Sequence, residues 1–120
     1  MATWHRVSLR LDPGLDARIT AMAERLGLSK AAVLRRLADQ GERMWRYPGI
    51  AFTGLDEHPH ARIAGTAVEV CRVVEAHRAV AGDIGRVLEA FASELAERHI
   101  RLALAYSREF PEEVDARSSA

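Results

Sequence analysis

The sequence predicts a mainly helical protein that begins with a single strand. Three observations carry this prediction: strict alternation over residues 5–11, helix start and stop residues on either side of Gly27, and apolar residues at helical spacing in the rest of the chain. The 120 residues allow one ordinary domain or two small ones and exclude a large two-domain enzyme. Charged residues make up 28% and apolar residues 48%, which excludes a disordered or fibrous chain.

The first expected element is a half-buried strand over residues 5–11, HRVSLRL. Its side chains alternate between two faces. The apolar residues are Val7, Leu9 and Leu11, and the polar residues are Arg6, Ser8 and Arg10. The N-terminal half offers no second strand, and two extended candidates downstream, around residues 50–53 and 62–64, are brief and flanked by glycine.

The same strand of a second copy is therefore the simpler partner. Antiparallel pairing about a two-fold axis places the apolar residues of both copies in a shared dimer core. The opposite face then becomes a basic two-stranded ribbon, which the major groove of duplex DNA admits.

Two helices are expected after this strand. Asp12 and Pro13 are typical of a helix start, and an apolar stripe follows up to Leu26. Gly27 ends this helix as a left-handed cap, and Ser29 caps the next one. The apolar stripe expected on the second helix consists of Leu34, Leu37, Ala38, Gly41 and Trp45.

This stretch, RVSLRLDPGLDARITAMAERLGLSKAAVLRRL, resembles the ribbon-helix-helix DNA-binding family, the class of CopG, MetJ and Arc. The resemblance implies that the outward ribbon residues Arg6, Ser8 and Arg10 read base edges. It also implies that the start of the second helix, at Ser29, Lys30 and Ala31, grips phosphate. Arginine pairs bidentately with guanine, and a lysine beside free helix amides favours an anion.

A second domain is expected over residues 48–120, after a ribbon-helix-helix domain over residues 1–47. Residues 46–61 are rich in proline, glycine and polar residues and indicate a connector. Three helices are then expected: one bearing Val70, Val73, Val74 and His77, one capped by Asp83, and one over residues 97–110. Three such helices with a short second turn predict a helix-turn-helix-like bundle.

Residues 48–116 also resemble a known domain. The pieces IAGT, VEVCRVVEAH, AGDIGRVLEAF and LAERHIRLALAYSREFPEEVDA resemble the helix-turn-helix-like domain of unknown function in VapB-type antitoxins. The resemblance implies that the protein is the autoregulating antitoxin of a type II toxin–antitoxin pair, with a PIN-domain toxin as partner.

Charge and targeting features complete the expectations. Over residues 1–47, nine Lys and Arg oppose five Asp and Glu, and residues 48–120 show the reverse imbalance of eight against twelve. A polyanion is the natural partner of the basic half. For the acidic half, another subunit or a basic protein is favoured over phosphates, and DNA contact by this half is the alternative. No apolar run is long enough to span a membrane and no signal peptide is evident, so a cytoplasmic location is expected. The single cysteine, Cys71, is expected to be a buried apolar side chain.

No enzymatic site emerges. His58 and His60 lie two residues apart in a loop, which is not metal-ligand spacing, so neither a metal nor a cofactor is expected. The carboxylates of Glu109, Glu112, Glu113 and Asp115 indicate a solvated acidic tail. The sequence thus predicts a DNA-binding transcriptional repressor, a homodimer or higher even oligomer. The alternative is a dimeric adaptor that does not bind DNA and holds a protein partner through its acidic domain.

Overall fold

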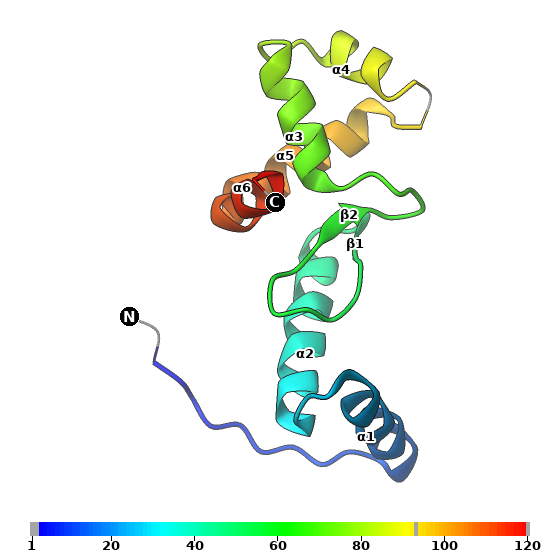
Figure 1. The fold of residues 1–120 in the computed structure, drawn as a ribbon, viewed down its shortest axis with the longest axis vertical. Helices are drawn as coiled ribbons and strands as arrows, with labels where there is room; N and C mark the ends of the chain where they lie inside the picture. Colours follow the sequence, from blue (N-terminus) through cyan, green and yellow to red (C-terminus); the bar gives the residue numbers. More distant parts are fainter. Residues whose placement is uncertain (1–2, 93, 120) are drawn as a thin grey trace. The chain divides into compact units, whose positions relative to one another are not determined.

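The computed structural model describes residues 3–92 and 94–119 and divides the chain into two compact units. The N-terminal unit extends to Arg35 and the C-terminal unit begins at Arg36 (Figure 1). The boundary falls inside one helix, α2, Lys30–Arg46. The predicted mainly helical class is confirmed, since six helices and one small two-stranded sheet make up the regular structure of the described residues.

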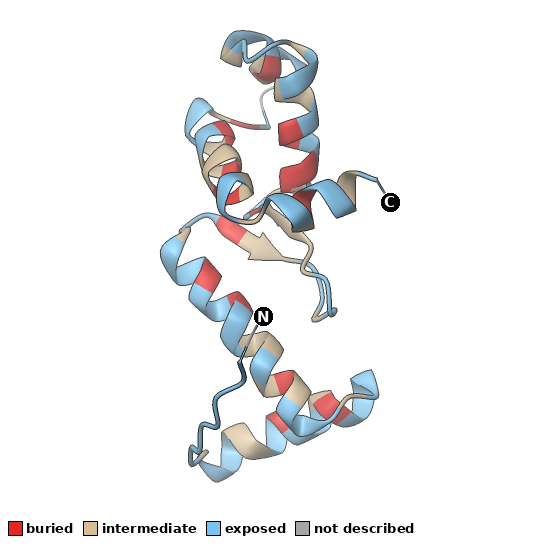
Figure 2. Ribbon diagram, turned by 90° about the vertical axis from the view of Figure 1, so that its left-hand side faces the viewer, coloured by how far each residue is buried: buried red, intermediate tan, exposed pale blue. Residues whose placement is uncertain are grey.

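Residues 3–12 form neither helix nor strand in the single chain and run as an extended trace (Figure 1). Val7 is 77% exposed and Leu9 61% exposed, while Leu11 is half-buried. Figure 2 shows the segment before Leu11 as exposed. A strand requires a partner for its backbone groups, and no strand of the described chain pairs with this segment. The ribbon strand therefore stays a prediction that depends on a second copy.

The first helix, α1, Pro13–Leu26, has both predicted caps. The Asp12 carboxylate accepts a hydrogen bond from the Leu15 amide at 3.0 Å, and Pro13 occupies the first helical position. Gly27 ends the helix with φ 67°, and the amide of Leu28 donates to the carbonyl of Ala23. This bond pattern is the Schellman motif, which requires the left-handed conformation that glycine adopts readily.

Helix α2 begins as predicted but buries a different face. The Ser29 hydroxyl accepts from the Ala32 amide at 3.0 Å. The predicted apolar stripe is wrong over the second half of the helix, where Trp45 is 86% exposed. The buried residues there are Gln40 and Arg43. Their polar groups are satisfied, since Gln40 Nε2 donates to the Gly54 carbonyl and Arg43 has acidic partners.

The connector after α2 contains a short hairpin. Strand β1, Ile50–Phe52, pairs antiparallel with β2, Ala61–Ile63, with Ile50 opposite Ile63. The two extended candidates thus pair with each other, which removes both as partners for residues 5–11. Ile50 and Ile63 are buried and join the core of the C-terminal unit.

Four helices complete the C-terminal unit: α3, Val70–Ala79; α4, Ile84–Ala90; α5, Glu97–Glu109; and α6, Pro111–Ser118. As predicted, Val70, Val73 and Val74 are buried on α3, and the Asp83 carboxylate caps α4 by accepting from the Arg86 amide. Helix α5 packs along α3 and buries Tyr106 completely. None of the helices in the described part of the chain has the length and apolar character needed to cross a membrane.

The prediction of three helices in this half is incomplete because it omits α6. The acidic segment forms this helix, with Pro111 in its first turn and Val114 buried. The acidic segment is therefore not a free tail, although Glu109, Glu112 and Asp115 are exposed, as expected of a solvated segment. Three of its four carboxylates form ion pairs: Glu109 with Arg46, Glu113 with Arg43, and Asp115 with Arg78. A helix-turn-helix-like arrangement of this unit stays a prediction.

Candidate nucleic-acid interface

The three predicted base-reading residues lie on the extended segment before α1. Arg6, Ser8 and Arg10 are all exposed. Among the described residues, none of the three side chains makes a hydrogen bond or an ion pair. Their donors are therefore available to an external acceptor, which is the condition that base reading requires.

The apolar residues that alternate with them are exposed as well. Val7 and Leu9 leave large apolar areas open to solvent, and Trp4 precedes them with 82% exposure. The guanidinium of Arg35 on α2 lies 5.8 Å from the centre of the Trp4 ring, a cation–π contact within the N-terminal unit. Sequence reasoning missed this contact, because the two residues are thirty-one positions apart and share no motif.

The start of α2 presents free backbone amides. Ser29 accepts hydrogen bonds from two backbone amides near the start of the helix: its hydroxyl accepts from the Ala32 amide and its carbonyl from the Val33 amide. The amides of Lys30 and Ala31 come before the first position that can bond backward along the helix. Both residues are exposed. The N-terminal end of the helix dipole adds a favourable field for an anion at this point.

The side chain of Lys30 has an acidic partner that sequence reasoning did not anticipate. Its Nζ forms an ion pair with the carboxylate of Asp16 in the first turn of α1, and both side chains are 45% exposed. An exposed pair of this kind is weak. A phosphate at the start of α2 would nevertheless compete with Asp16 for the ammonium group.

The geometry of this segment agrees with the comparison against known families. Residues 5–42 match the ribbon-helix-helix protein, copG family. The match covers the extended segment, α1, the Gly27 turn and most of α2, and it supports the ribbon-helix-helix interpretation of this part of the chain. Comparison with curated proteins and with solved structures finds no match.

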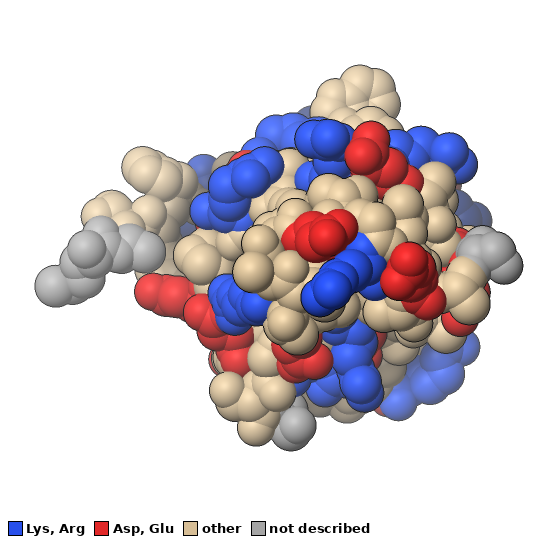
Figure 3. Space-filling view, turned by 90° about the horizontal axis from the view of Figure 1, so that it is seen from above, with Lys and Arg blue, Asp and Glu red and all other residues tan. Residues whose placement is uncertain are grey.

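The N-terminal unit, most of which belongs to the ribbon-helix-helix segment, has a net positive charge. The N-terminal unit carries six Lys and Arg against three Asp and Glu, whereas the C-terminal unit carries eleven against fourteen. The face of the molecule in Figure 3 mixes both signs and shows no field of one charge. The net positive charge, which favours nucleic acid, thus lies in the N-terminal unit.

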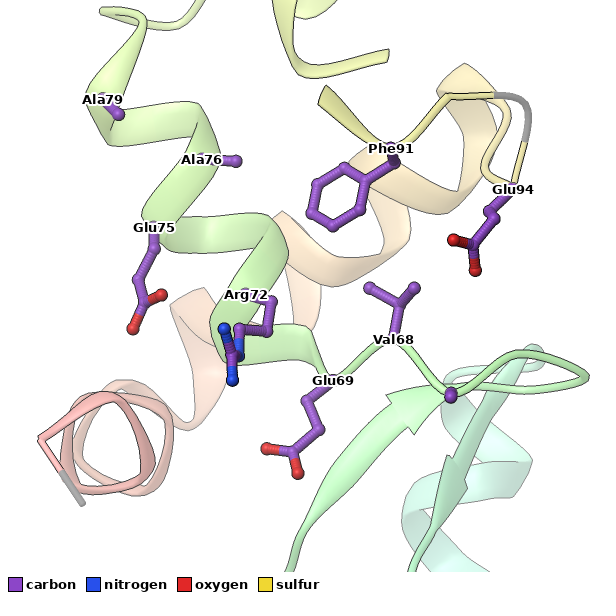
Figure 4. A pocket seen from close by; sticks show the side chains of 9 residues that line it. Val68, Glu69, Arg72, Glu75, Ala76, Ala79, Phe91 and Glu94 are labelled. Carbon is purple, nitrogen blue, oxygen red and sulfur yellow. The ribbon is translucent and has the colours of Figure 1, made fainter. Parts of the chain in front are cut away.

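Outside the ribbon-helix-helix segment, the C-terminal unit has an open pocket of about 600 Å³ (Figure 4). Val68, Ala76 and Phe91 form its apolar wall, and Glu75, Glu94 and Arg72 lie at its rim. Glu69 lines it too, but its carboxylate is held by two hydrogen bonds of 2.8 Å from Arg117. Those bonds lower the pKa of Glu69 to about 2, although partial burial opposes the shift.

Cys71 lies beside this pocket and is buried, as predicted. Burial, and then the hydrogen bond that its thiol donates to Glu69, raise the pKa of Cys71 to about 11. In the described part of the chain, no three His, Cys, Asp or Glu side chains are placed to hold a metal ion. His60 lies 3.8 Å from the carboxylate of Asp56, within its own loop.

Proposed function

We propose that the protein is a homodimeric DNA-binding transcriptional repressor whose ribbon enters the major groove. The observation that carries the proposal is the state of residues 5–11 in the single chain. Their polar side chains are exposed and unpaired among the described residues, Val7 and Leu9 are exposed, and their backbone has no partner strand. Pairing with a second copy satisfies the backbone and buries Val7, Leu9 and Leu11 in one step.

In this dimer Arg6, Ser8 and Arg10 from each copy face the groove. Each arginine that pairs bidentately with a guanine contributes about 1–3 kcal/mol of discrimination, and Ser8 tolerates several base edges. The exposed amides of Lys30 and Ala31, next to the capped Ser29, hold a backbone phosphate and fix the position of the ribbon. The functional domains of the proposal are residues 1–47 and 48–120.

The finer part of the proposal is the role of an autoregulating antitoxin in a type II toxin–antitoxin pair. It is supported by the resemblance of residues 48–116 to antitoxin domains and by the net negative charge of the C-terminal unit. In this role the ribbon represses transcription of the protein's own gene, and the C-terminal domain binds a PIN-domain nuclease. The alternative is an adaptor whose ribbon only dimerises and whose acidic domain binds a protein partner.

The experiment that tests the proposal is fluorescence anisotropy on DNA from just upstream of the protein's own gene, with scrambled DNA as competitor, across a salt series. Tight binding that prefers the native sequence is expected. Binding that is weak and indifferent to sequence would favour the adaptor.

Two ribbon variants sharpen this test. Arg6→Ala and Arg10→Ala are each expected to lose about 1–3 kcal/mol on the upstream site and little on scrambled DNA. The matched control is Arg25→Ala, which removes the same charge from the exposed last turn of α1. If the control loses as much discrimination as the ribbon variants, Arg6 and Arg10 do not read bases.

A further inference from the structure

The solvent side of α5 carries a row of three exposed arginines, here called the arginine row. The row consists of Arg98, Arg101 and Arg108. Because helical residues advance by about 100° each, these three fall within a sector of about 80°. The buried residues Ile100 and Tyr106 lie on the other side of the helix, where α5 packs on α3. The row spans about 15 Å along the helix axis.

The positive charge of the arginine row is only partly compensated by neighbouring acids. Arg101 is 3.5 Å from the carboxylate of Glu97, but both side chains are more than half exposed, so the pair is weak. Glu109, the acid at the far end of α5, is already held by two hydrogen bonds of 2.6 Å from Arg46. Among the described residues, Arg98 and Arg108 make no ion pair. The row is thus a positive strip on a unit whose net charge is negative.

The arginines around the pocket are in a different setting. Arg72 lines the pocket with Glu69, Glu75 and Glu94 (Figure 4). Its charge is embedded among carboxylates, which repel an incoming polyanion. The arginine row is flanked on α5 by two acids, Glu97 and Glu109, and Glu109 is held by Arg46. The row therefore keeps an excess of positive charge, which makes it the strip of this unit suited to an anionic surface.

We propose that the arginine row is a second contact surface for the sugar–phosphate backbone of duplex DNA. The inference rests on the proposed DNA-binding function and adds a contact that no ribbon residue supplies. Guanidinium groups bind phosphate oxygens in a bidentate way, and duplex DNA carries one charge per about 1.7 Å of its axis, so a row of about 15 Å meets several phosphates. No side chain of the row is placed by a neighbour to read bases, so its contribution is independent of sequence.

The test compares the full-length parent with the triple variant Arg98→Ala, Arg101→Ala and Arg108→Ala. Each phosphate contact contributes about −0.9 to the slope of log affinity against log salt concentration, so the triple variant is expected to flatten the slope by about two to three units. Affinity at moderate salt is expected to fall about tenfold or more, equally for upstream and scrambled DNA. The ratio of the two affinities is expected to stay constant.

The matched control is the triple variant Arg72→Ala, Arg78→Ala and Arg86→Ala, which removes three exposed arginines from α3 and α4 of the same unit. The control is expected to change the slope by less than one unit. A further variant that replaces the arginine row by lysines keeps the charge and is expected to retain most of the slope. Circular dichroism of each variant verifies that the helices are intact.

Each outcome decides between distinct conclusions. If the parent binds its upstream DNA and the triple variant keeps the full slope, the arginine row does not touch DNA, while the proposed function stands. If the control loses as much slope as the triple variant, net charge rather than the row is responsible and the inference fails. If the parent does not bind DNA, the proposed function fails and this inference fails with it.

Discussion

Arg43 of α2 donates a hydrogen bond of 2.5 Å to Glu113 of α6, although the two residues are seventy positions apart in the chain. The same guanidinium donates to the Tyr106 hydroxyl at 3.0 Å and lies 3.9 Å from the centre of the Phe110 ring. Arg43 is buried, with 8% of its surface exposed. The contacts of Arg43 with Tyr106, Phe110 and Glu113 hold the second half of α2 against the α5–α6 segment within the C-terminal unit.

Loss of Arg43 is therefore expected to destabilise the protein strongly. Arg43→Ala removes the charged donor from Glu113 and from the Tyr106 hydroxyl, and breaking a buried pair costs roughly 3–5 kcal/mol. Because the Glu113 side chain keeps 27% exposure, the expected loss lies at the lower end of that range. Urea unfolding measures it. The control is Arg46→Ala, whose pair with Glu109 is exposed and is expected to contribute far less to stability. Equal losses would contradict the buried role of Arg43.

Gly49 is expected to tolerate no side chain. Its φ is 104°, and a Cβ built there would lie 2.8 Å from Leu102 Cδ2. Gly49→Ala combines backbone strain with a clash, and each mechanism costs about 1–3 kcal/mol. Gly41→Ala is the contrast, because a Cβ there meets nothing within 4 Å and the residue lies inside α2. That variant is expected to gain about 0.5–1 kcal/mol. Thermal unfolding of both variants provides the comparison.

Asp16 is expected to restrain DNA binding. Asp16→Asn releases Lys30 from its ion pair, so affinity is expected to rise for all DNA sequences. The gain is at most about fivefold, because an exposed pair contributes about 0–1 kcal/mol. Anisotropy against scrambled and upstream DNA measures the change. Glu24→Gln removes the same charge from the exposed side of α1 and is the control. An equal gain in the control would show that net charge, rather than Lys30, sets the affinity.

Acid is expected to weaken the C-terminal unit through Glu69. Its pKa in the folded protein is about 2, below the usual value of 4.5, because Arg117 donates two hydrogen bonds to it. A depressed pKa stabilises the folded state above the unfolded pKa, and this stability is lost as the pH falls from about 5 to about 2. Glu69→Gln is expected to reduce the slope of unfolding free energy against pH in that window. The matched control is Glu75→Gln, at an exposed position of α3. If it reduces the slope as much as Glu69→Gln does, the pair with Arg117 is not the cause.

The thiol of Cys71 is expected to react slowly in the folded protein. Burial raises its pKa to about 11 from a usual value of 9, which lowers the thiolate fraction at pH 8 by about a hundredfold. Modification by a chromogenic disulfide reagent is expected to be slow in buffer and fast in denaturing urea. Rapid modification of the native protein would contradict the buried position of Cys71 on α3.

Local signals predicted much of the fold. Asp12, Gly27, Ser29 and Asp83 act where the sequence places them, because a cap depends on residues within three or four positions. The apolar face of α3 follows from its valines for the same reason. Asp12, Gly27 and Ser29 lie in the ribbon-helix-helix segment, and simple alternation along the same segment predicted which of its arginines share a face.

Long-range pairing could not be predicted in this way. Arg43 is buried because it pairs with Tyr106 and Glu113, which lie more than sixty positions away in the chain. The charged residues around Arg43 in the sequence of α2 give no sign of these partners and indicate only a solvated surface. Helix α6 was missed because its acids suggested a tail, while their basic partners on α2 and α3 are remote in sequence. The arginine row was not predicted, because apolar residues separate its members in the sequence of α5.

The position of the unit boundary inside α2 limits how the protein can be dissected. A cut between Arg35 and Arg36 would sever a continuous helix and leave carbonyls and amides at the new ends without partners. A cut after Tyr47 keeps the helix whole but removes Arg43 from Tyr106 and Glu113. Neither truncation yields two undisturbed pieces. The two proposed activities, DNA binding and partner binding, are therefore better separated by point substitutions in the intact chain than by expressing halves.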